Sequence, residues 1–292
     1  MTQTSNPTDG RVAAVQMSSG DNVSVNLAHA ADLLGKAAAQ GAQLVLLPEN
    51  FAFMGRGAKG RLAVAEAEGH GPIQTFLAQT ARRLGLWIVA GTVPLVLPDD
   101  AERVAPACLV YDARGERVAR YDKIHLFDVD LPNGGTQYRE SVGFRAGPPQ
   151  PVCVDTPVGR VGLSVCYDLR FPELYRSLSA AGAELLCVPA AFTAPTGEAH
   201  WQVLLRARAV ENLCYVIAAA QCGTHPDGRA TWGHSLIVGP WGQTLASVDS
   251  ASNEGTAVAP ASRAHCRELR ARFPALQHRR LPAGGAAYPQ RP

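Results

Sequence analysis

The chain has 292 residues, of which 47% are apolar and 18% are charged, and its formal net charge is +2. This length and apolar content suffice for one large core, and the near balance of charge provides no field for polyanions, so we expect no nucleic-acid partner. The low charged fraction predicts that a partner subunit covers part of the surface. No segment approaches the roughly 20 consecutive apolar residues of a membrane span, so no membrane association is expected.

The two ends of the chain differ in composition from its centre. Residues 1–10 are polar and lack the basic and apolar regions of a signal peptide, so they predict a disordered lead. Residues 11–280 show no linker and no repeat and predict a single domain, with residues 281–292 as a C-terminal tail. The seven cysteines form no CxxC pair and mostly lie in apolar runs, which is typical of reduced thiols and indicates a cytoplasmic protein.

Strand-like runs alternate with helical patterns along the whole chain. In the first half we expect a strand over 12–17, a helix over 22–40, a strand over 44–47, a helix over 72–85, a broken strand over 86–96 and a hairpin over 107–120. In the second half we expect strands over 161–165, 185–188, 215–220 and 235–238, and helices over 172–181 and 198–212.

This alternation predicts an α/β fold. The continuous apolar run over 44–47 is typical of a strand that is buried on both faces. Many short strands beside few long helices favour two stacked sheets with helices outside over one doubly wound sheet.

Three reactive residues each follow a strand-like run, namely Glu49, Lys123 and Cys166. A sheet fixes the backbone at such a point, while the following loop leaves the side chain free to react. Cys166 also lies just ahead of the helix expected to begin at Pro172, whose N-terminal dipole favours a thiolate and whose free N–H groups can hold an oxyanion. Lysine is rare in this chain and otherwise occurs only at Lys36 and Lys59, which indicates that a compact ammonium is required at Lys123.

Other catalytic classes fit the sequence less well. The segment Gly162-Leu-Ser164-Val-Cys166 departs from the G-x-S-x-G elbow of serine hydrolases because a cysteine replaces the second glycine. A cysteine protease needs a histidine base, and the nearest candidates, His125 and His200, have no diagnostic setting. The chain contains no HExxH motif and no paired Cys/His spacing, so no metal site is expected.

The sequences around the three reactive residues resemble the signature blocks of the nitrilase superfamily of carbon–nitrogen hydrolases. These stretches are Leu-Leu-Pro-Glu49-Asn-Phe, Tyr-Asp-Lys123-Ile-His-Leu-Phe-Asp and Cys166-Tyr-Asp-Leu-Arg-Phe-Pro-Glu-Leu, in the order that the family has them. The resemblance implies a Glu–Lys–Cys triad without a cofactor, and a four-layer α-β-β-α sandwich that forms a homodimer through a helical face. It also implies that Glu140 is a second acidic residue beside the triad.

On this basis Glu49 accepts the thiol proton, and Cys166 attacks the carbonyl of a small-molecule amide to give a thioester. Lys123 and the backbone N–H of Tyr167 are the expected donors to the oxyanion. The stretches Glu-Ala-His200-Trp-Gln and Leu-Gln-His278-Arg-Arg are similar to the branch that repairs deaminated glutathione, with 2-oxoglutarate and cysteinylglycine as products. The alternatives are an ω-amidase acting on 2-oxoglutaramate or another small aliphatic amide, and a non-catalytic sandwich protein that binds a partner.

Arg170 follows Cys166 closely and is the expected substrate-binding residue. Its guanidinium offers two parallel N–H donors that match a planar α-keto carboxylate. Thr193 and Thr196 are expected to supply hydroxyl donors to the same group. In the alternative interpretation, Arg170 pairs with Asp168 or Glu173 and only braces the loop.

Overall fold

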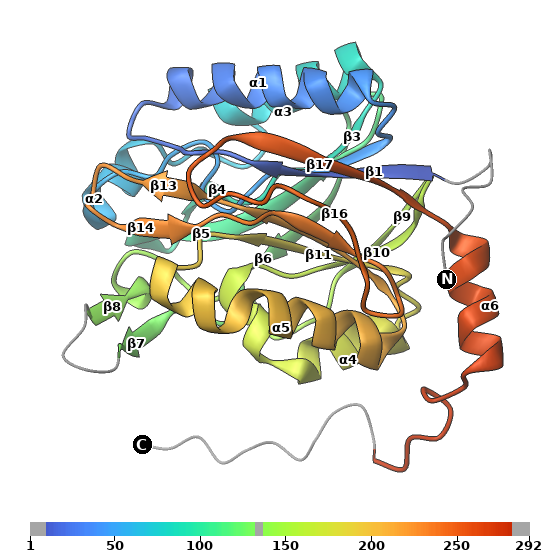
Figure 1. Ribbon diagram of the computed structural model, residues 1–292. Coiled ribbons are helices and arrows are strands. Elements are labelled where there is room, and N and C mark those ends of the chain that lie inside the picture. Colours follow the sequence, from blue (N-terminus) through green and yellow to red (C-terminus); the bar gives the residue numbers. More distant parts are fainter. Residues whose placement is uncertain (1–9, 132–136, 282–292) are drawn as a thin grey trace.

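Two β-sheets are stacked face to face, with helices on both outer faces (Figure 1). The computed structural model describes residues 10–131 and 137–281. The N-terminal lead and the C-terminal tail expected from the sequence therefore lie outside the described residues, except that Gly10 already belongs to the first strand and Leu281 is still described.

The first sheet has seven strands, most of which come from the N-terminal half of the chain. Its order is β17 (Gly255–Ala261), β1 (Gly10–Gln16), β2 (Leu44–Leu46), β3 (Trp87–Val89), β5 (Asp100–Tyr111) and β4 (Val93–Leu97), with β6 (Arg117–Asp122) paired to β5. The second sheet has six strands in the order β16 (Thr244–Ser247), β15 (Leu236–Val238), β12 (Tyr215–Ala220), β11 (Leu185–Ala190), β10 (Gly159–Leu163) and β9 (Cys153–Thr156).

Parallel strands occupy the centre of both sheets, and they explain the continuous apolar runs of the sequence. β1, β2 and β3 pair in parallel, as do β10, β11 and β12. In β2, Leu44 and Leu46 belong to the core between the two sheets, whereas Val45 belongs to the core beneath the outer helices. The strand is thus buried on both faces, as predicted.

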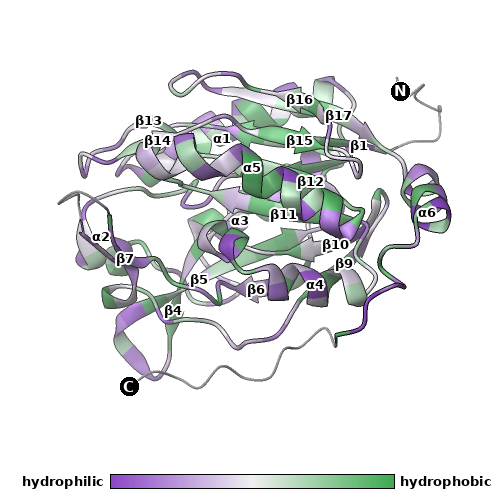
Figure 2. Ribbon diagram, turned by 60° about the horizontal axis from the view of Figure 1, so that its bottom comes forward, coloured by the Kyte–Doolittle hydropathy of each residue, from purple (hydrophilic) through white to green (hydrophobic). Residues whose placement is uncertain are grey.

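Each outer face carries a pair of helices. α1 (Val23–Ala39) and α3 (Pro72–Leu84) cover the first sheet, while α4 (Pro172–Ala180) and α5 (Ala194–Asn212) cover the second. Figure 2 shows apolar residues concentrated on inner strands such as β12 and β15, and mixed polarity on the helices. The four-layer α-β-β-α sandwich is therefore confirmed. None of the helices in the described segments combines the length and the apolar character needed to cross a bilayer.

Several elements differ from the sequence-based prediction. The broken strand expected over 86–96 is two strands, β3 and β4, because the chain turns at Gly91, where φ is 53° and a Cβ atom would lie 2.0 Å from the carbonyl oxygen of Pro48. The expected helix over 198–212 begins four residues earlier, at Ala194, since Pro195 is well suited to the first turn of a helix. Several further elements were not expected. They are the strands β9, β16 and β17, the helices α2 (Gly57–Ala63) and α6 (Arg263–Arg272), and the antiparallel strand pairs β7 (Asp128–Asp130) with β8 (Gln137–Arg139) and β13 (Cys222–Thr224) with β14 (Ala230–Trp232).

Candidate active site

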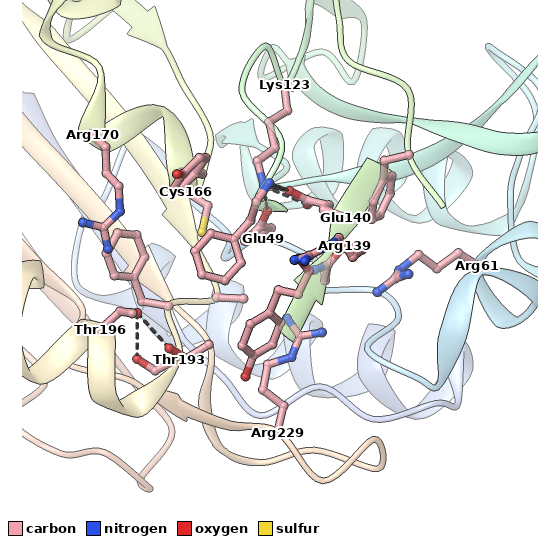
Figure 3. Close-up of a pocket in the computed structure, with 17 residues that line it drawn as sticks. Glu49, Arg61, Lys123, Arg139, Glu140, Cys166, Arg170, Thr193, Thr196 and Arg229 are labelled. Carbon is pink, nitrogen blue, oxygen red and sulfur yellow. Dashed lines mark hydrogen bonds and ion pairs between the residues drawn. The ribbon is translucent and has the colours of Figure 1, made fainter. Parts of the chain in front are cut away.

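One pocket of about 650 Å³, its open mouth included, brings together every site residue expected from the sequence (Figure 3). The expected residues among its lining are Glu49, Lys123, Glu140, Cys166, Tyr167, Arg170, Thr193 and Thr196.

Glu49 follows β2, and its backbone is fixed by residues from both sheets. The side-chain amide of Gln221, just beyond β12, donates to the carbonyl of Glu49 at 3.0 Å and to the hydroxyl of Ser19 at 2.7 Å. The next residue, Asn50, has a positive φ of 58°, and its N–H donates to the hydroxyl of Thr92 at 2.8 Å. Residues of the two sheets therefore hold the backbone at Glu49 jointly.

Lys123 follows β6, and its ammonium is almost completely buried between two carboxylates. Its Nζ lies 2.9 Å from Oε1 of Glu49 and 2.8 Å from both carboxylate oxygens of Glu140. Glu140 begins a short 3₁₀ helix (Glu140–Val142), and its Oε2 also accepts the backbone N–H of Phe127 at 2.6 Å. Each of the three charges thus has a fixed partner, and the position of Lys123 is determined from both sides.

Cys166 lies at a sharp turn beyond β10. It begins a second 3₁₀ helix (Cys166–Arg170) and has φ of 49°, a conformation that a non-glycine residue rarely adopts. In the first turn of a helix, N–H groups lack intrahelical acceptors, so the N–H of Tyr167 is available to a ligand. The turn thus places the thiol in the lining of the pocket, beside a donor.

Asp168 ties the turn at Cys166 to the chain around Lys123. Its buried carboxylate accepts the hydroxyl of Tyr121 at 2.6 Å, the N–H of Val165 at 2.8 Å and the N–H of His125 at 3.1 Å. Nδ1 of His125 lies 2.7 Å from the same carboxylate, and its ring stacks on Phe171 with centroids 3.6 Å apart. Asp168 was considered from the sequence only as a partner for Arg170, so this bridge between two signature stretches is new information from the structure.

The buried charges set the protonation states of the pocket floor. Burial raises the pKa of the Cys166 thiol well above its ordinary value and the neighbouring Glu49 adds to this shift, whereas Lys123 opposes it. Burial alone would lower the pKa of Lys123, but Glu140 and Glu49 more than offset that effect and hold its pKa well above the ordinary value. The resting site therefore contains a neutral thiol beside an ammonium.

Arg170 lies on one wall of the pocket and makes an ion pair with neither Asp168 nor Glu173 in the described part of the chain. Both of its terminal nitrogens lie 3.3 Å from Nδ1 of His200, and its guanidinium lies 5.4 Å from the ring centre of Phe192. The hydroxyls of Thr193 and Thr196 lie 2.8 Å apart on the same side of the pocket as Arg170 (Figure 3).

Three arginines in the lining were missed from the sequence, namely Arg61, Arg139 and Arg229. Arg139 pairs with Asp130 at 2.7 Å, and Arg229 pairs with Asp227 at 3.2 Å. No sequence pattern distinguishes these three as pocket residues, because arginine supplies most of the cations in this chain and the three lie in unrelated segments.

The competing sequence interpretations find little support in the geometry. Ser164 is fully buried, and its hydroxyl is bonded to the hydroxyl of Tyr175 at 2.7 Å and to the carbonyl of Cys187 at 2.8 Å, away from the pocket lining. The ring of His125 is hydrogen-bonded to Asp168 and that of His200 to Arg170, and in the described part of the chain neither ring is hydrogen-bonded to Cys166. Within residues 10–131 and 137–281, no cluster of His, Cys, Asp or Glu is arranged to hold a metal ion.

Comparison with known proteins places these features in a family. Residues 11–271 match the carbon–nitrogen hydrolase family model. The deaminated glutathione amidase of Yersinia enterocolitica is 43% identical over 94% of both chains, and that of Synechocystis sp. is 46% identical over 91% of this chain and 97% of its own.

Solved structures agree with this assignment. The C. elegans NitFhit protein superposes with a TM-score of 0.86 at 38% identity, covering 93% of this chain and 66% of that one. An amidase from Nesterenkonia sp., solved with acrylamide added to its active-site cysteine, gives a TM-score of 0.74 at 30% identity, covering 90% of this chain and 98% of that one. With its fold, its three signature stretches and these relatives, the chain belongs to the carbon–nitrogen hydrolase family.

Proposed function

We propose that this carbon–nitrogen hydrolase cleaves an amide with Glu49, Lys123 and Cys166 as its catalytic triad. The observation that carries the proposal is the placement of Lys123 between the carboxylates of Glu49 and Glu140, in the same pocket as the Cys166 thiol. The Nesterenkonia amidase of the same family modified at its active-site cysteine supports a cysteine nucleophile.

The protonation states define the order of proton movements. Because burial and Glu49 raise the pKa of Cys166, the thiol transfers its proton to Glu49 only as its sulfur attacks the amide carbonyl. The oxyanion that forms accepts hydrogen bonds from Lys123 and from the backbone N–H of Tyr167. Glu49 then gives the proton to the departing nitrogen, the C–N bond breaks, and a thioester remains on Cys166.

In the hydrolysis of the thioester, Glu49 again accepts and returns a proton, this time between water and the sulfur of Cys166. Water enters the position left by the amine, Glu49 accepts a proton from it, and the hydroxide attacks the thioester carbonyl. The C–S bond breaks, the sulfur recovers its proton from Glu49, and the carboxylic acid leaves. Glu140 does not exchange protons in this scheme; it holds Lys123 at the oxyanion.

For the substrate, we infer the ω-amide of an α-keto acid, first of all deaminated glutathione, with 2-oxoglutarate and cysteinylglycine as products. Arg170, which has no carboxylate partner among the described residues, supports this choice together with the hydroxyls of Thr193 and Thr196, because these groups fit an α-keto carboxylate. The relatives named deaminated glutathione amidase support the same substrate. An ω-amidase acting on 2-oxoglutaramate or another small aliphatic amide is the second candidate, since these acyl contacts suit 2-oxoglutaramate equally.

A substrate panel tests this proposal. We expect the purified protein to hydrolyse deaminated glutathione with a higher kcat/KM than 2-oxoglutaramate, and to act least on an aliphatic amide without a carboxylate. A preference for 2-oxoglutaramate would instead assign an ω-amidase. Hydrolysis of the simple amide alone would contradict the role of Arg170.

Thiol alkylation separates an enzyme from a non-catalytic binding protein. All seven cysteines are free, and most are buried. With limiting iodoacetamide, we expect mass spectrometry to find Cys166 modified first, and a keto-acid amide to slow this modification. Equal labelling of the accessible cysteines would favour the binding protein.

We also propose a cytoplasmic homodimer. The free cysteines support the reducing location. Val203 and Val210 on α5 are 61% and 49% exposed, and Trp241 and Phe273, whose rings lie 5.5 Å apart, are also exposed. Nε of Arg206 on α5 donates to the carbonyl of Gly242 at 2.8 Å, so α5 and Trp241 share one surface. Light scattering at micromolar concentration should give twice the chain mass, and a monomer would contradict the proposal.

A further inference from the structure

Arg61 is a charged pocket residue that has no part in the mechanism above. It lies on α2 and points into the pocket from the side opposite Arg170, beyond the two glutamates (Figure 3). In the described segments, no carboxylate lies within ion-pair distance of its guanidinium, whereas Arg139 and Arg229 each have one.

The environment of Arg61 disfavours its charge. Partial burial, and after it the neighbouring Arg229, lowers the pKa of Arg61, and the negative charges of Glu140, Asp227 and Glu49 only partly compensate. A charged group that is partly removed from water without an ion-pair partner costs free energy, and a bound anion would offset this cost. The carboxylates of the catalytic floor are not free to play this part, because Lys123 occupies them both.

The orientation of Arg61 is also fixed before any ligand binds. The centre of its guanidinium lies 4.8 Å from the ring centre of Phe144. Stacking on an aromatic ring covers one face of the guanidinium and leaves its N–H edges free for a planar carboxylate. The ring of Tyr138 similarly supports Arg229, whose guanidinium lies 5.5 Å from it.

The position of Arg61 relative to the sulfur identifies the part of a substrate that it can meet. If Arg170 holds the keto-acid end of the substrate, the acyl chain runs from Arg170 to Cys166. The amide nitrogen and everything attached to it then extend past Cys166, toward Glu49, Glu140 and Arg61. A primary amide loses only ammonia and places nothing near Arg61. An amide of an amino acid or a peptide carries a carboxylate in that direction.

We propose that Arg61, flanked by Arg229, binds the carboxylate of the leaving amine and thereby selects amides of amino acids or short peptides over primary amides. This inference rests on the proposed function, since it takes Arg170 as the site of the keto acid. It assigns the pocket two anion subsites, one on each side of the nucleophile. The acyl subsite alone would not discriminate between deaminated glutathione and 2-oxoglutaramate.

The test compares three substrates with three enzymes. The substrates are deaminated glutathione, the same compound with a C-terminal carboxamide in place of the carboxylate, and 2-oxoglutaramate. The enzymes are the wild type, Arg61→Gln, and Lys59→Gln as a matched control that removes an exposed cation from the same short helix.

We expect Arg61→Gln to lower kcat/KM for deaminated glutathione roughly 10- to 100-fold, the scale of a charged hydrogen bond, and to leave the other two substrates within about twofold. The wild type should lose a similar factor when the carboxylate is replaced by the carboxamide, and Lys59→Gln should change none of the three values. Equal losses of Arg61→Gln on all three substrates would show a structural role and overturn the inference, as would no loss on any.

The two proposals fail in different ways. If the wild type hydrolyses deaminated glutathione and its carboxamide equally well, the keto-acid amidase stands and only the subsite at Arg61 is overturned. If the wild type hydrolyses none of the three compounds, the proposed function itself is overturned.

Discussion

The floor of the pocket, formed by Glu49, Lys123, Glu140 and Cys166, differs from its walls, which carry the arginines, in how charges are paired. On the floor, the ammonium of Lys123 contacts the carboxylates of both Glu49 and Glu140, and all three groups are largely buried. On the walls, Arg170 and Arg61 contact rings or a histidine and no carboxylate of the described chain. The floor is complete without a ligand, so its geometry is preorganised for chemistry. Arg170 and Arg61 on the walls lack counter-charges, which a ligand can supply.

Loss of the proposed nucleophile should have the largest effect. We expect Cys166→Ala to lower kcat by about 10⁴-fold or more. Circular dichroism and Tm should stay close to the wild type, because the substitution removes only the sulfur atom and alanine adopts the same positive φ as the cysteine that it replaces. Cys153→Ala, which changes a half-buried cysteine outside the pocket, is the control and should retain activity. Substantial turnover by the Cys166 variant would exclude it as the nucleophile.

Replacement of either charged member of the proposed triad, in Glu49→Gln or Lys123→Met, should lower kcat roughly 10²- to 10⁴-fold. Because they act as a unit, we expect the double variant to lose little more than either single variant.

The same variants should shift the pKa of Cys166 in opposite directions. Burial, the main cause of the raised pKa, remains in both variants, whereas Glu49 raises the pKa further and Lys123 lowers it. In Glu49→Gln the alkylation rate of Cys166 should therefore begin to rise at a lower pH than in the wild type. In Lys123→Met it should begin to rise at a higher pH. Shifts of the same sign would contradict the charge arrangement of the floor.

Substitution on the wall should affect one substrate class selectively. Arg170→Lys keeps the charge but loses the two parallel N–H donors. We expect kcat/KM for keto-acid amides to fall roughly 30-fold, which corresponds to a loss of about 2 kcal/mol of transition-state stabilisation. A simple amide without a carboxylate should change far less. Equal losses on both substrates would mean that Arg170 braces the catalytic turn.

This contrast also explains what could be predicted from the sequence. Glu49, Lys123 and Cys166 each follow a strand within a distinctive local sequence, and the apolar runs around them predict the sheets that bring them together. Because these signals are local, they suffice to predict the four-layer fold and the family, and both predictions are confirmed.

The walls depend on contacts between distant segments that local patterns do not encode. Arg61 lies on a seven-residue helix without a buried residue, so no apolar periodicity marks it, and Phe144, on which it stacks, comes from a loop that follows Glu140. The contacts of Asp168 are likewise not encoded locally. Its partners Tyr121 and His125 flank Lys123 and lie 47 and 43 residues earlier in the sequence. Such contacts require the folded chain.

Substitution of His200, which is hydrogen-bonded to Arg170, should have the smallest effect on activity. Its Nδ1 lies 3.3 Å from both terminal nitrogens of Arg170, and since a guanidinium only donates, this nitrogen of His200 acts as the acceptor. Replacement by Leu removes the acceptor and frees Arg170 to rotate, which should raise KM for keto-acid amides about three- to tenfold, with little change in kcat. His200→Gln offers a side-chain carbonyl oxygen instead and should recover most of this loss. Because His200 acts only through Arg170, the Leu substitution in an Arg170→Lys background should add little, as measured by a double-mutant cycle on KM. Full additivity would show that His200 binds the substrate independently of Arg170.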